Sequence, residues 1–481
     1  MDRTLALLLA AAVLAGCLSP HPSAAPAPTG SPTPASGAPA AAPIQGSPAL
    51  AGRVRVVDVG LPFYEPALGI TRSGTFAVCC VPAPEDPTRL GEATVVSHDG
   101  GASWSFSHVQ RLSSFDPMLA VDAVTDRIDE LNMAGVSCSN LAFSDDQGAT
   151  WTDRPLSCAV PAYDFLKLAA GKPGPGANPL AGAAYASVAY QCRNVNEVSL
   201  TGPYVLLSNW CAVSYDGGLT WPVDREVAGR GVRVRGQQVT PSDGCGGVTG
   251  FPTVGPDGTA VLPIGNGCDT FLVGVSRDSG LTWALRAGPP HRGIISATPE
   301  AEFDAAGHLY VLWQDGNGTM QLVRSDDLGA TWRGPWSVMP PGVHAASFEA
   351  MEAGAEGRLA MAFLGTNETA RKDTGDVSDK ARWHLYVVTA EQAQTDAPVL
   401  ASYRATPLDD PDQVGPVCFG GSGCLRNLGD FITADQAADG TFVVAYADGC
   451  TDGCAGKPDA TSKDDSAGAG RLAILDGWRL R

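Results

Sequence analysis

The chain has little positive charge. It holds 32 lysines and arginines against 51 acidic residues in a total of 481, so its formal net charge is −19. Nucleic-acid binding depends on clustered lysine and arginine, and this balance excludes that class of partner. Charged residues contribute only 17% of the chain, whereas 44% is hydrophobic, which is enough for a large folded core.

Several motifs of known chemistry are also missing. The sequence has no HExxH, no GxSxG and no phosphate-binding loop, and its seven histidines are scattered. Zinc-protease, serine-hydrolase and nucleotide chemistry are therefore not expected. After the N-terminus, no stretch is long and apolar enough to span a bilayer. The 57 glycines and 37 prolines favour short strands joined by turns.

The N-terminus is typical of an exported protein. Residues 1–17 form a short apolar run that ends in Leu-Ala-Gly-Cys. This end resembles a prokaryotic lipobox, so we expect lipidation of Cys17 and a location in the cell envelope, outside the cytoplasm. Residues 18–48 contain nine prolines and no charged side chain, which predicts a disordered tether. The folded domain is then 49–481.

The main signal is a repeated eight-residue segment. Five segments fit Ser-x-Asp-x-Gly-x-(Ser/Thr)-Trp, at 97–104, 144–151, 214–221, 276–283 and 325–332. The pattern is typical of a hairpin turn, because the Asp can accept hydrogen bonds from turn amides and the Gly can take positive φ. We expect a structural role for the five aspartates, which are Asp99, Asp146, Asp216, Asp278 and Asp327.

These segments are identified as Asp-boxes, or BNR repeats, and the chain resembles a sialidase-like β-propeller. The resemblance implies an all-β fold of four-stranded antiparallel blades. A second repeat, an acidic residue or a proline before an apolar strand, starts seven times, at about residues 65, 116, 164, 251, 300, 349 and 430. We therefore predict seven blades, with the six of sialidases as the alternative. The strand at 53–59 is expected to pair with 472–478 and close the ring.

The cysteines other than Cys17 number twelve, an even count that suits an oxidising compartment. Local spacing favours disulfides within hairpins, although the sequence alone does not fix the pairing. The expected pairs are Cys138–Cys158, Cys192–Cys211, Cys245–Cys268, Cys418–Cys424 and Cys450–Cys454. Cys79 and Cys80 remain, as a vicinal pair or as free thiols. A zinc site is a weaker reading, because the spacings are irregular and no histidine is near.

The resemblance places a ligand where the innermost strands begin, at one end of the ring, which we call the mouth. The residues at these starts include Tyr64, Glu65, Asp116, Asp164, Glu300, Glu349 and Asp430. Each acid alone is explained equally well as a cap on a strand. As a group they would suit a cation or a polyhydroxylated ligand. No cofactor is expected, apart from a structural Ca²⁺ that an acidic mouth would accommodate.

The catalytic set of sialidases is incomplete here. Those enzymes hold the substrate carboxylate with three arginines, the first of them in an Arg-Ile-Pro motif. The matching place reads Phe63-Tyr64-Glu65-Pro66, so that arginine is missing and cleavage of sialic acid is not expected. Cleavage of a neutral glycoside would need two mouth carboxylates. The candidates are Asp116 or Asp164 as acid/base and Glu300 or Glu349 as partner, with Tyr64, Glu65 and Asp430 contacting the substrate.

Two functions follow from these observations. The first is an exported, monomeric propeller, held at the membrane by its lipid, that binds a glycan or another small molecule at the mouth and hydrolyses glycosidic bonds there if the carboxylates allow it. The second is a non-catalytic scaffold that binds a protein or an envelope component. The fold alone does not choose between them, because propellers host many functions.

Overall fold

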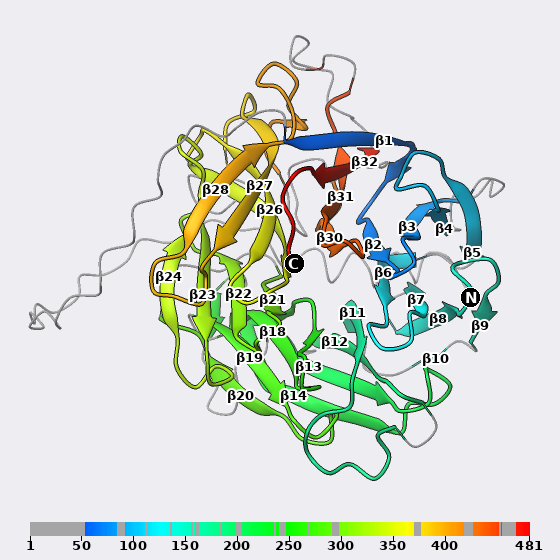
Figure 1. Cartoon of the computed structure of the whole chain (residues 1–481). Coiled ribbons are helices and arrows are strands. Elements are labelled where there is room, and N and C mark those ends of the chain that lie inside the picture. The colour runs from blue at the N-terminus through cyan, green and yellow to red at the C-terminus, as the bar shows by residue number, and fades with distance from the viewer. Residues whose placement is uncertain are drawn as a thin grey trace, which may run out of the picture.

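The computed structural model is a ring of seven β-sheets arranged around one axis (Figure 1). It describes residues 53–83, 92–110, 114–134, 137–154, 157–158, 163–182, 185–198, 204–234, 237–239, 247–267, 270–290, 298–369, 377–417, 427–451, 454 and 468–481. Every regular element in these ranges is a β-strand. The predicted all-β propeller with seven blades is confirmed, and the six-bladed alternative is wrong.

Each blade is an antiparallel sheet whose first strand lies innermost. The first three blades contain β2 (Ala67–Ile70), β3 (Phe76–Pro82), β4 (Glu92–Ser97) and β5 (Ser105–Gln110); β6 (Ser114–Val121), β7 (Ile128–Ala134), β8 (Cys138–Ser144), β9 (Thr152–Asp153) and β10 (Ser157–Cys158); and β11 (Tyr163–Gly171), β12 (Val188–Val198), β13 (Tyr204–Ser214), β14 (Val223–Val234) and β15 (Gln237–Val239).

The other four blades repeat this order. They contain β16 (Val248–Thr249), β17 (Thr253–Val254), β18 (Ala260–Gly267), β19 (Thr270–Ser276) and β20 (Ala284–Ala287); β21 (Glu300–Phe303), β22 (Leu309–Gln314), β23 (Met320–Ser325) and β24 (Arg333–Ser337); β25 (Ala345–Ala353), β26 (Leu359–Thr366), β27 (Arg382–Glu391), β28 (Val399–Arg404) and β29 (Gln413–Val414); and β30 (Thr433–Gln436), β31 (Phe442–Asp448), β32 (Gly468–Leu475) and β1 (Val54–Phe63).

The ring closes through the seventh blade. The first strand of the chain, β1, pairs antiparallel with the last, β32, so that Val54 lies opposite Leu475 and Asp58 opposite Arg471. The expected closure is confirmed. Because β1 comes from the N-terminal end and the other three strands of its blade from the C-terminal end, the two ends of the domain share one sheet. The largest buried cluster includes residues from both ends.

The five Asp-box turns share one hydrogen-bond pattern. In the turn at 276–283, Thr282 donates to Asp278 through its backbone N (2.9 Å) and its hydroxyl (2.6 Å). The Ser276 hydroxyl donates to Asp278 (3.0 Å) and accepts from the Gly280 backbone N (2.8 Å). The same bonds form around the aspartates of the other four turns. Each carboxylate therefore links the two ends of its own turn through hydrogen bonds.

The glycine of each Asp-box also lies against the preceding blade. Gly280 has φ of +83°, and a Cβ there would lie 2.5 Å from Val213 of blade 3. A Cβ on Gly148 would lie 2.9 Å from Val96 of blade 1 in the same way. The conformation and the close approach both require glycine. Trp151 and Trp332 add hydrogen bonds to the preceding blade, through Ser107 and Ala287. The turn thus joins neighbouring blades as well as two strands.

The last two blades have no Asp-box and use other contacts at the same seams. In blade 6, Arg324 of the preceding blade donates to the carbonyls of Ala393 and Thr395, both at 3.1 Å. In blade 7, the third and fourth strands, β32 and β1, are not consecutive in sequence, so no hairpin turn joins them. Trp478, shortly after β32, donates to Glu391 of blade 6 instead (3.1 Å).

Three of the expected disulfides are confirmed, namely Cys138–Cys158, Cys192–Cys211 and Cys450–Cys454. The pairs proposed for Cys245–Cys268 and Cys418–Cys424 lie outside the described residues. Cys79 is disulfide-bonded, so the free-thiol alternative is wrong for it, and the side chain of Cys80 lies outside the description.

Within the described ranges, no helix has the length and hydrophobicity to cross a membrane. Cys17, the predicted tether at 18–48 and the start of the domain at 49 precede the described residues.

Acid should weaken the Asp-box turns selectively. Hydrogen bonds from Ser103 and Ser97 lower the pKa of Asp99 from 3.8 to about 2. Its stabilising effect is therefore complete above the pKa of the unfolded chain and is lost as the pH falls from about 4 towards 2. We expect Asp99→Asn to lower the Tm at neutral pH, and the difference from wild type to shrink on acidification. Differential scanning calorimetry between about pH 7 and pH 3 measures this.

Asp476→Asn serves as the control, because Asp476 is half exposed and makes a surface ion pair with Arg55. Such pairs contribute roughly 0–1 kcal/mol. A gap between Asp99→Asn and wild type that stays constant down to about pH 3 would contradict the role given to the carboxylate.

Candidate functional site

The candidate site is the mouth, where the seven inner strands begin. Strand direction alternates within each blade, so the starts of the inner strands and the Asp-box turns lie at opposite ends of the ring. The predicted residues occupy these starts. Tyr64 and Glu65 precede β2, Asp164 lies in β11, Glu300 opens β21, Glu349 lies in β25, and Asp430 precedes β30. Asp116 lies in β6, and its side chain is outside the description.

The backbone is strained at three of these starts. Glu65, Phe165 and Phe348 have φ of 54°, 50° and 59°, in the left-handed region that residues other than glycine rarely adopt. The pairing register shifts at the same places in β11 and β25, between Asp164 and Lys167 and next to Phe348. Bulges of this kind redirect side chains and are common beside functional sites.

Three phenylalanines from three blades meet at the axis, and we call Phe165, Phe251 and Phe431 the axial aromatic group. The rings of Phe251 and Phe431 contact each other edge to face, with centroids 5.6 Å apart. Phe431 is fully buried, whereas Phe165 and Phe251 remain partly exposed. The group therefore presents apolar ring surface to solvent at the mouth, although its members belong to blades 3, 4 and 7.

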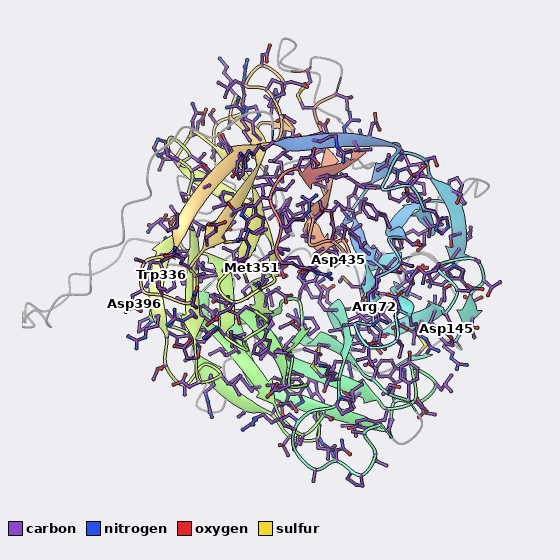
Figure 2. All side chains as sticks on the ribbon, in the orientation of Figure 1. Arg72, Asp145, Trp336, Met351, Asp396 and Asp435 are labelled. Atoms are coloured by element: carbon purple, nitrogen blue, oxygen red, sulfur yellow. A yellow bond between two sulfur atoms is a disulfide. The ribbon has the colours of Figure 1, made fainter. Side chains whose placement is uncertain are left out.

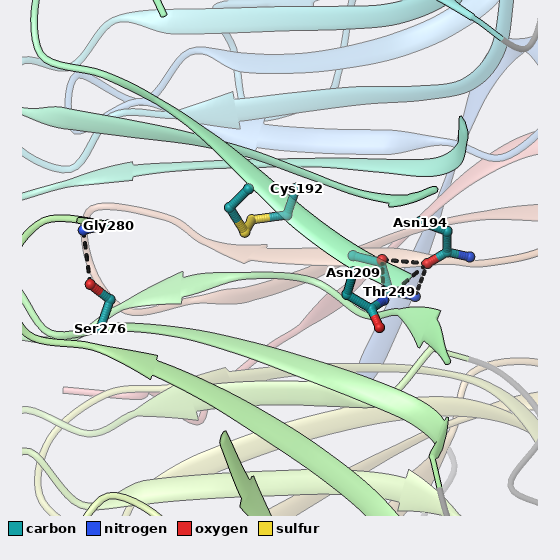
Figure 3. The surroundings of a disulfide bond; sticks show 7 residues. Cys192, Asn194, Asn209, Thr249, Ser276 and Gly280 are labelled. Carbon is teal, nitrogen blue, oxygen red and sulfur yellow. Dashed lines mark hydrogen bonds between the residues drawn. A yellow bond between two sulfur atoms is a disulfide. The ribbon is translucent and has the colours of Figure 1, made fainter. Parts of the chain in front are cut away.

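A buried network holds the strand that carries Phe251 (Figure 3). Asn194 accepts from the Thr249 backbone N at 2.7 Å, and Asn209 donates to the Thr249 hydroxyl at 2.9 Å and to the Gly247 carbonyl at 2.8 Å. Asn194 and Asn209 belong to blade 3, and Thr249 opens blade 4 two residues before Phe251. Satisfied polar networks of this kind fix one arrangement of the backbone.

Lys167 lies against all three rings of the axial aromatic group. Its ammonium nitrogen is 4.4 Å from the centroid of Phe431, 4.9 Å from Phe251 and 5.7 Å from Phe165. The side chain is fully buried, and the nitrogen has no hydrogen-bond acceptor among the described residues. Each cation–π contact contributes about 0.5–2 kcal/mol. Burial removes the water that would otherwise solvate the ammonium, and these contacts compensate for that loss only in part.

Glu300 of blade 5 lies near this lysine, and Glu349 of blade 6 lies near Glu300. Burial raises the pKa of Glu300 well above 4.5, and the nearby Glu302 and Glu349 raise it further, whereas Lys167 opposes the shift. Burial raises the pKa of Glu349 to about 8, against backbone amides close by that favour its charged form. Neither oxygen of Glu349 has a well-aligned hydrogen-bond donor among the described residues. Burial thus favours the protonated form of both carboxyls.

A second group of acids lies further along the inner strands. Glu302, Glu352 and Asp435 come from blades 5, 6 and 7, and Figure 2 shows Asp435 close to the axis. Burial raises the pKa of Glu302 to about 8, that of Asp435 to about 7, and that of Glu352 well above 4.5. Glu302 is hydrogen-bonded to Thr253, Asp435 to Ile70 and Glu352 to Gln436. These bonds link the inner strands of blades 4 and 5, of blades 7 and 1, and of blades 6 and 7.

The structure brings the predicted residues together in pairs. Glu349 is close enough to Glu300 to raise the pKa of Glu300. Glu65 packs against the turn of Asp430, because a Cβ on Gly429 would lie 2.5 Å from the Glu65 side chain. Asp164 accepts a hydrogen bond from the Phe165 backbone N, at 2.9 Å. The catalytic and substrate-binding roles given to these residues stay predictions.

Sequence reasoning missed the axial aromatic group and Lys167. A signal was present, because a phenylalanine adjoins the blade start in Asp164-Phe165, in Phe251-Pro252 and in Asp430-Phe431.

The structure also shows where other candidate groups stand. Arg193 on β12 pairs with Asp224 at 2.6 Å. Within the described part of the chain, no three acidic, histidine or cysteine side chains are placed to hold a metal ion.

Comparison with known proteins gives distant similarities. No family model and no curated protein matches the chain. Among solved structures it is similar to a protein of unknown function from Dyadobacter fermentans, with 12% identity over 88% of this chain and 98% of that one, at a TM-score of 0.42. It is also similar to the intramolecular trans-sialidase of Ruminococcus gnavus, with 13% identity over 87% and 98% and a TM-score of 0.41.

A third similarity is to the Aleuria aurantia lectin, solved with a fucosylated sugar. The identity is 13%, the coverage is 72% of this chain and 98% of the lectin, and the TM-score is 0.40. At these identities and TM-scores, the similarities assign no ligand or activity to this chain. The seven-bladed ring itself is consistent with the sialidase-like propeller that the Asp-boxes indicated.

The raised pKa of Glu349 gives a testable pH dependence. The folded protein binds this proton more tightly than the unfolded chain does, with a pKa of about 8 against 4.5. Its effect on stability is therefore most favourable below the unfolded pKa and is lost as the pH rises to about 8. We expect Glu349→Gln to remove this loss, an effect on the order of a few kcal/mol between about pH 5 and pH 9.

Urea unfolding at a series of pH values measures the effect, with Glu226→Gln as the control on the exposed face of β14. Parallel pH profiles for wild type and Glu349→Gln would contradict this expectation, because they would mean that Glu349 has an ordinary pKa in the folded protein.

Proposed function

We propose that the protein binds a glycan on the axial aromatic group at the mouth. The observation that supports this most is the partly exposed ring surface of Phe165 and Phe251, held rigidly at the axis by strands from different blades. Binding sites for small molecules combine apolar and aromatic surface with a few fixed polar groups. A sugar ring offers both an apolar face of C–H groups and hydroxyls, so it matches such a surface.

The polar groups at the same place favour a neutral sugar over an acidic one. Asp164 adjoins Phe165, and Tyr64 precedes β2 at the mouth; both are partly exposed and would bond sugar hydroxyls. Among the described residues of the inner strands, acidic side chains outnumber basic ones. The single basic side chain there, Lys167, is fully buried. An acidic sugar would gain little attraction there, and the arginine of Arg-Ile-Pro is absent.

Hydrolysis is the second candidate, and the raised pKa values of Glu300 and Glu349 favour it, because a general acid must hold its proton at working pH. Both side chains are buried, with 5% and 2% exposed. A sugar would reach them only if the residues around them moved, so binding is the function that the geometry supports best. A scaffold for a protein partner remains the alternative from another class.

The aromatic group should decide ligand binding. We expect the chain to retain a neutral glycan on a glycan array, and Phe251→Ala to weaken that binding at least tenfold, which is about 1.4 kcal/mol. Phe106→Ala is the matched control, because Phe106 is an exposed phenylalanine on the outer strand β5. Isothermal titration calorimetry on the best array hit gives the affinities.

Either of two results would contradict the proposal: no glycan bound by a folded wild type, or equal affinity for Phe251→Ala and wild type. Capture of a protein partner that both phenylalanine variants retain would favour the scaffold. Chromogenic glycosides tested on the same samples examine hydrolysis, and turnover that Glu300→Gln leaves unchanged would remove Glu300 from that role.

We further propose that the protein is exported and held at the membrane by a lipid on Cys17. The support is the lipobox-like segment at the N-terminus together with three disulfides, which form in oxidising compartments. Cys17→Ser should move the protein from the membrane fraction to the soluble fraction of a bacterial host. Equal membrane retention of both forms would contradict the anchor.

A further inference from the structure

A histidine bridges two carboxylates at the seam between blades 1 and 2. Nδ1 of His108, on the outer strand β5, lies 2.9 Å from an Oε of Glu130 on β7. Nε2 lies 3.0 Å from an Oδ of Asp153 on β9. Glu130 is fully buried, the imidazole is nearly so, and the Asp153 side chain is 75% exposed. The imidazole thus reaches from blade 1 to two strands of blade 2.

The number of N–H donors that this geometry needs determines which protonation state of the imidazole suits it. An ionised carboxylate only accepts, so each ring nitrogen must carry a proton to bond it. A neutral imidazole has one N–H and satisfies one of the two carboxylates, whereas the imidazolium satisfies both. Glu130 already accepts from the Thr94 hydroxyl (2.8 Å) and from the Asn132 amide (2.9 Å), so both of its oxygens act as acceptors here.

Other groups pack around the His108 bridge. Trp151, the last residue of the Asp-box before β9, stacks on the imidazole with centroids 4.8 Å apart and planes at 19°. The Cys79 sulfur, 3.9 Å from Glu130, is disulfide-bonded and does not titrate. Glu92, two residues before Thr94 on β4, is the other acid on this face. The Arg154 guanidinium lies over the Phe143 ring, at 5.3 Å.

We propose that His108 is a proton-operated clamp between the first two blades, closed as the imidazolium and released by deprotonation. On release, the remaining N–H stays with the buried Glu130, because an unpaired buried carboxylate is the costlier loss. The bond to the exposed Asp153 is then given up, which frees β9 and the Asp-box that ends in Trp151. Loss of the proton therefore loosens the outer part of blade 2.

The direction of the titration agrees with this. Burial lowers the pKa of His108, and the hydrogen bonds and charges of Glu130 and Asp153 outweigh it, so the net shift is upward from 6.5. A histidine with a raised folded pKa stabilises fully below the unfolded pKa, and its contribution is lost as the pH rises through the folded pKa. The clamp is closed below the unfolded pKa of 6.5 and opens as the pH rises through the higher folded pKa.

Two measurements on the full chain test the clamp. In wild type, NMR of ¹³C-labelled histidines should show one imidazole that titrates above 6.5 and that disappears from the spectrum of His108→Gln. Asp153→Asn should lower that pKa, because one of the two carboxylates is gone while the buried pair with Glu130 remains. Asp153 is exposed, so this variant is expected to fold.

Hydrogen exchange followed by mass spectrometry localises the effect. After correction for intrinsic exchange, the peptide covering 144–154 should lose protection several-fold between about pH 6 and pH 9 in wild type. In His108→Gln the same peptide should show the lower, alkaline level of protection at all pH values. His98→Gln is the control, because His98 is an exposed histidine that bonds only the Thr75 hydroxyl, at 3.0 Å.

A His108 pKa at or below 6.5 would overturn the proposal. So would equal protection of 144–154 in wild type and His108→Gln across the pH range. If His108→Gln does not fold, the wild-type titration and the Asp153→Asn shift still decide the question.

Discussion

The pairing of β1 with β32 is the constraint on which the rest of the structure depends. It joins residues more than four hundred positions apart, such as Val54 and Leu475, and completes a sheet that neither end of the domain forms alone. Each blade buries its faces against its two neighbours, so an open ring would expose both faces of the gap. The closure also fixes the axis, because the inner strands converge only when all seven blades are in place.

Neighbouring blades pack through apolar side chains, and a few specific polar contacts are added at each seam. Five use the glycine of an Asp-box, which has positive φ in every case, and at Gly148, Gly218 and Gly280 a Cβ would clash with the preceding blade. The others use Arg324 on a carbonyl pair and Trp478 on Glu391. His108 adds a titratable contact at the first seam. Individual seams can therefore respond to conditions while the ring stays closed.

The sequence was most informative where structure is encoded locally. The Asp-box turns, the seven blade starts and the hairpin disulfides depend on residues within about twenty positions, so their patterns are visible in one segment. The closing strand was predictable because an unpaired strand stood at each end. The site was less so: Glu300 and Glu349 were found as strand-start acids, but Lys167 and Phe431 meet only across the ring. The bulge between Asp164 and Lys167 also shifts the alternation that would have marked the lysine as inward-facing.

The closed ring explains two features of the site. The inner strands converge at the axis, which places aromatic side chains at the mouth and buries the acids of the inner strands. The most direct test of closure is a cross-link between Val56→Cys and Ala473→Cys, which lie directly opposite in β1 and β32. Peptide mapping without reduction should find this disulfide within one monomer in high yield, and little of it when Leu472→Cys replaces Ala473→Cys, because side chains one residue apart point to opposite faces. Equal yields for the two pairs, or cross-links only between molecules, would contradict the closed ring.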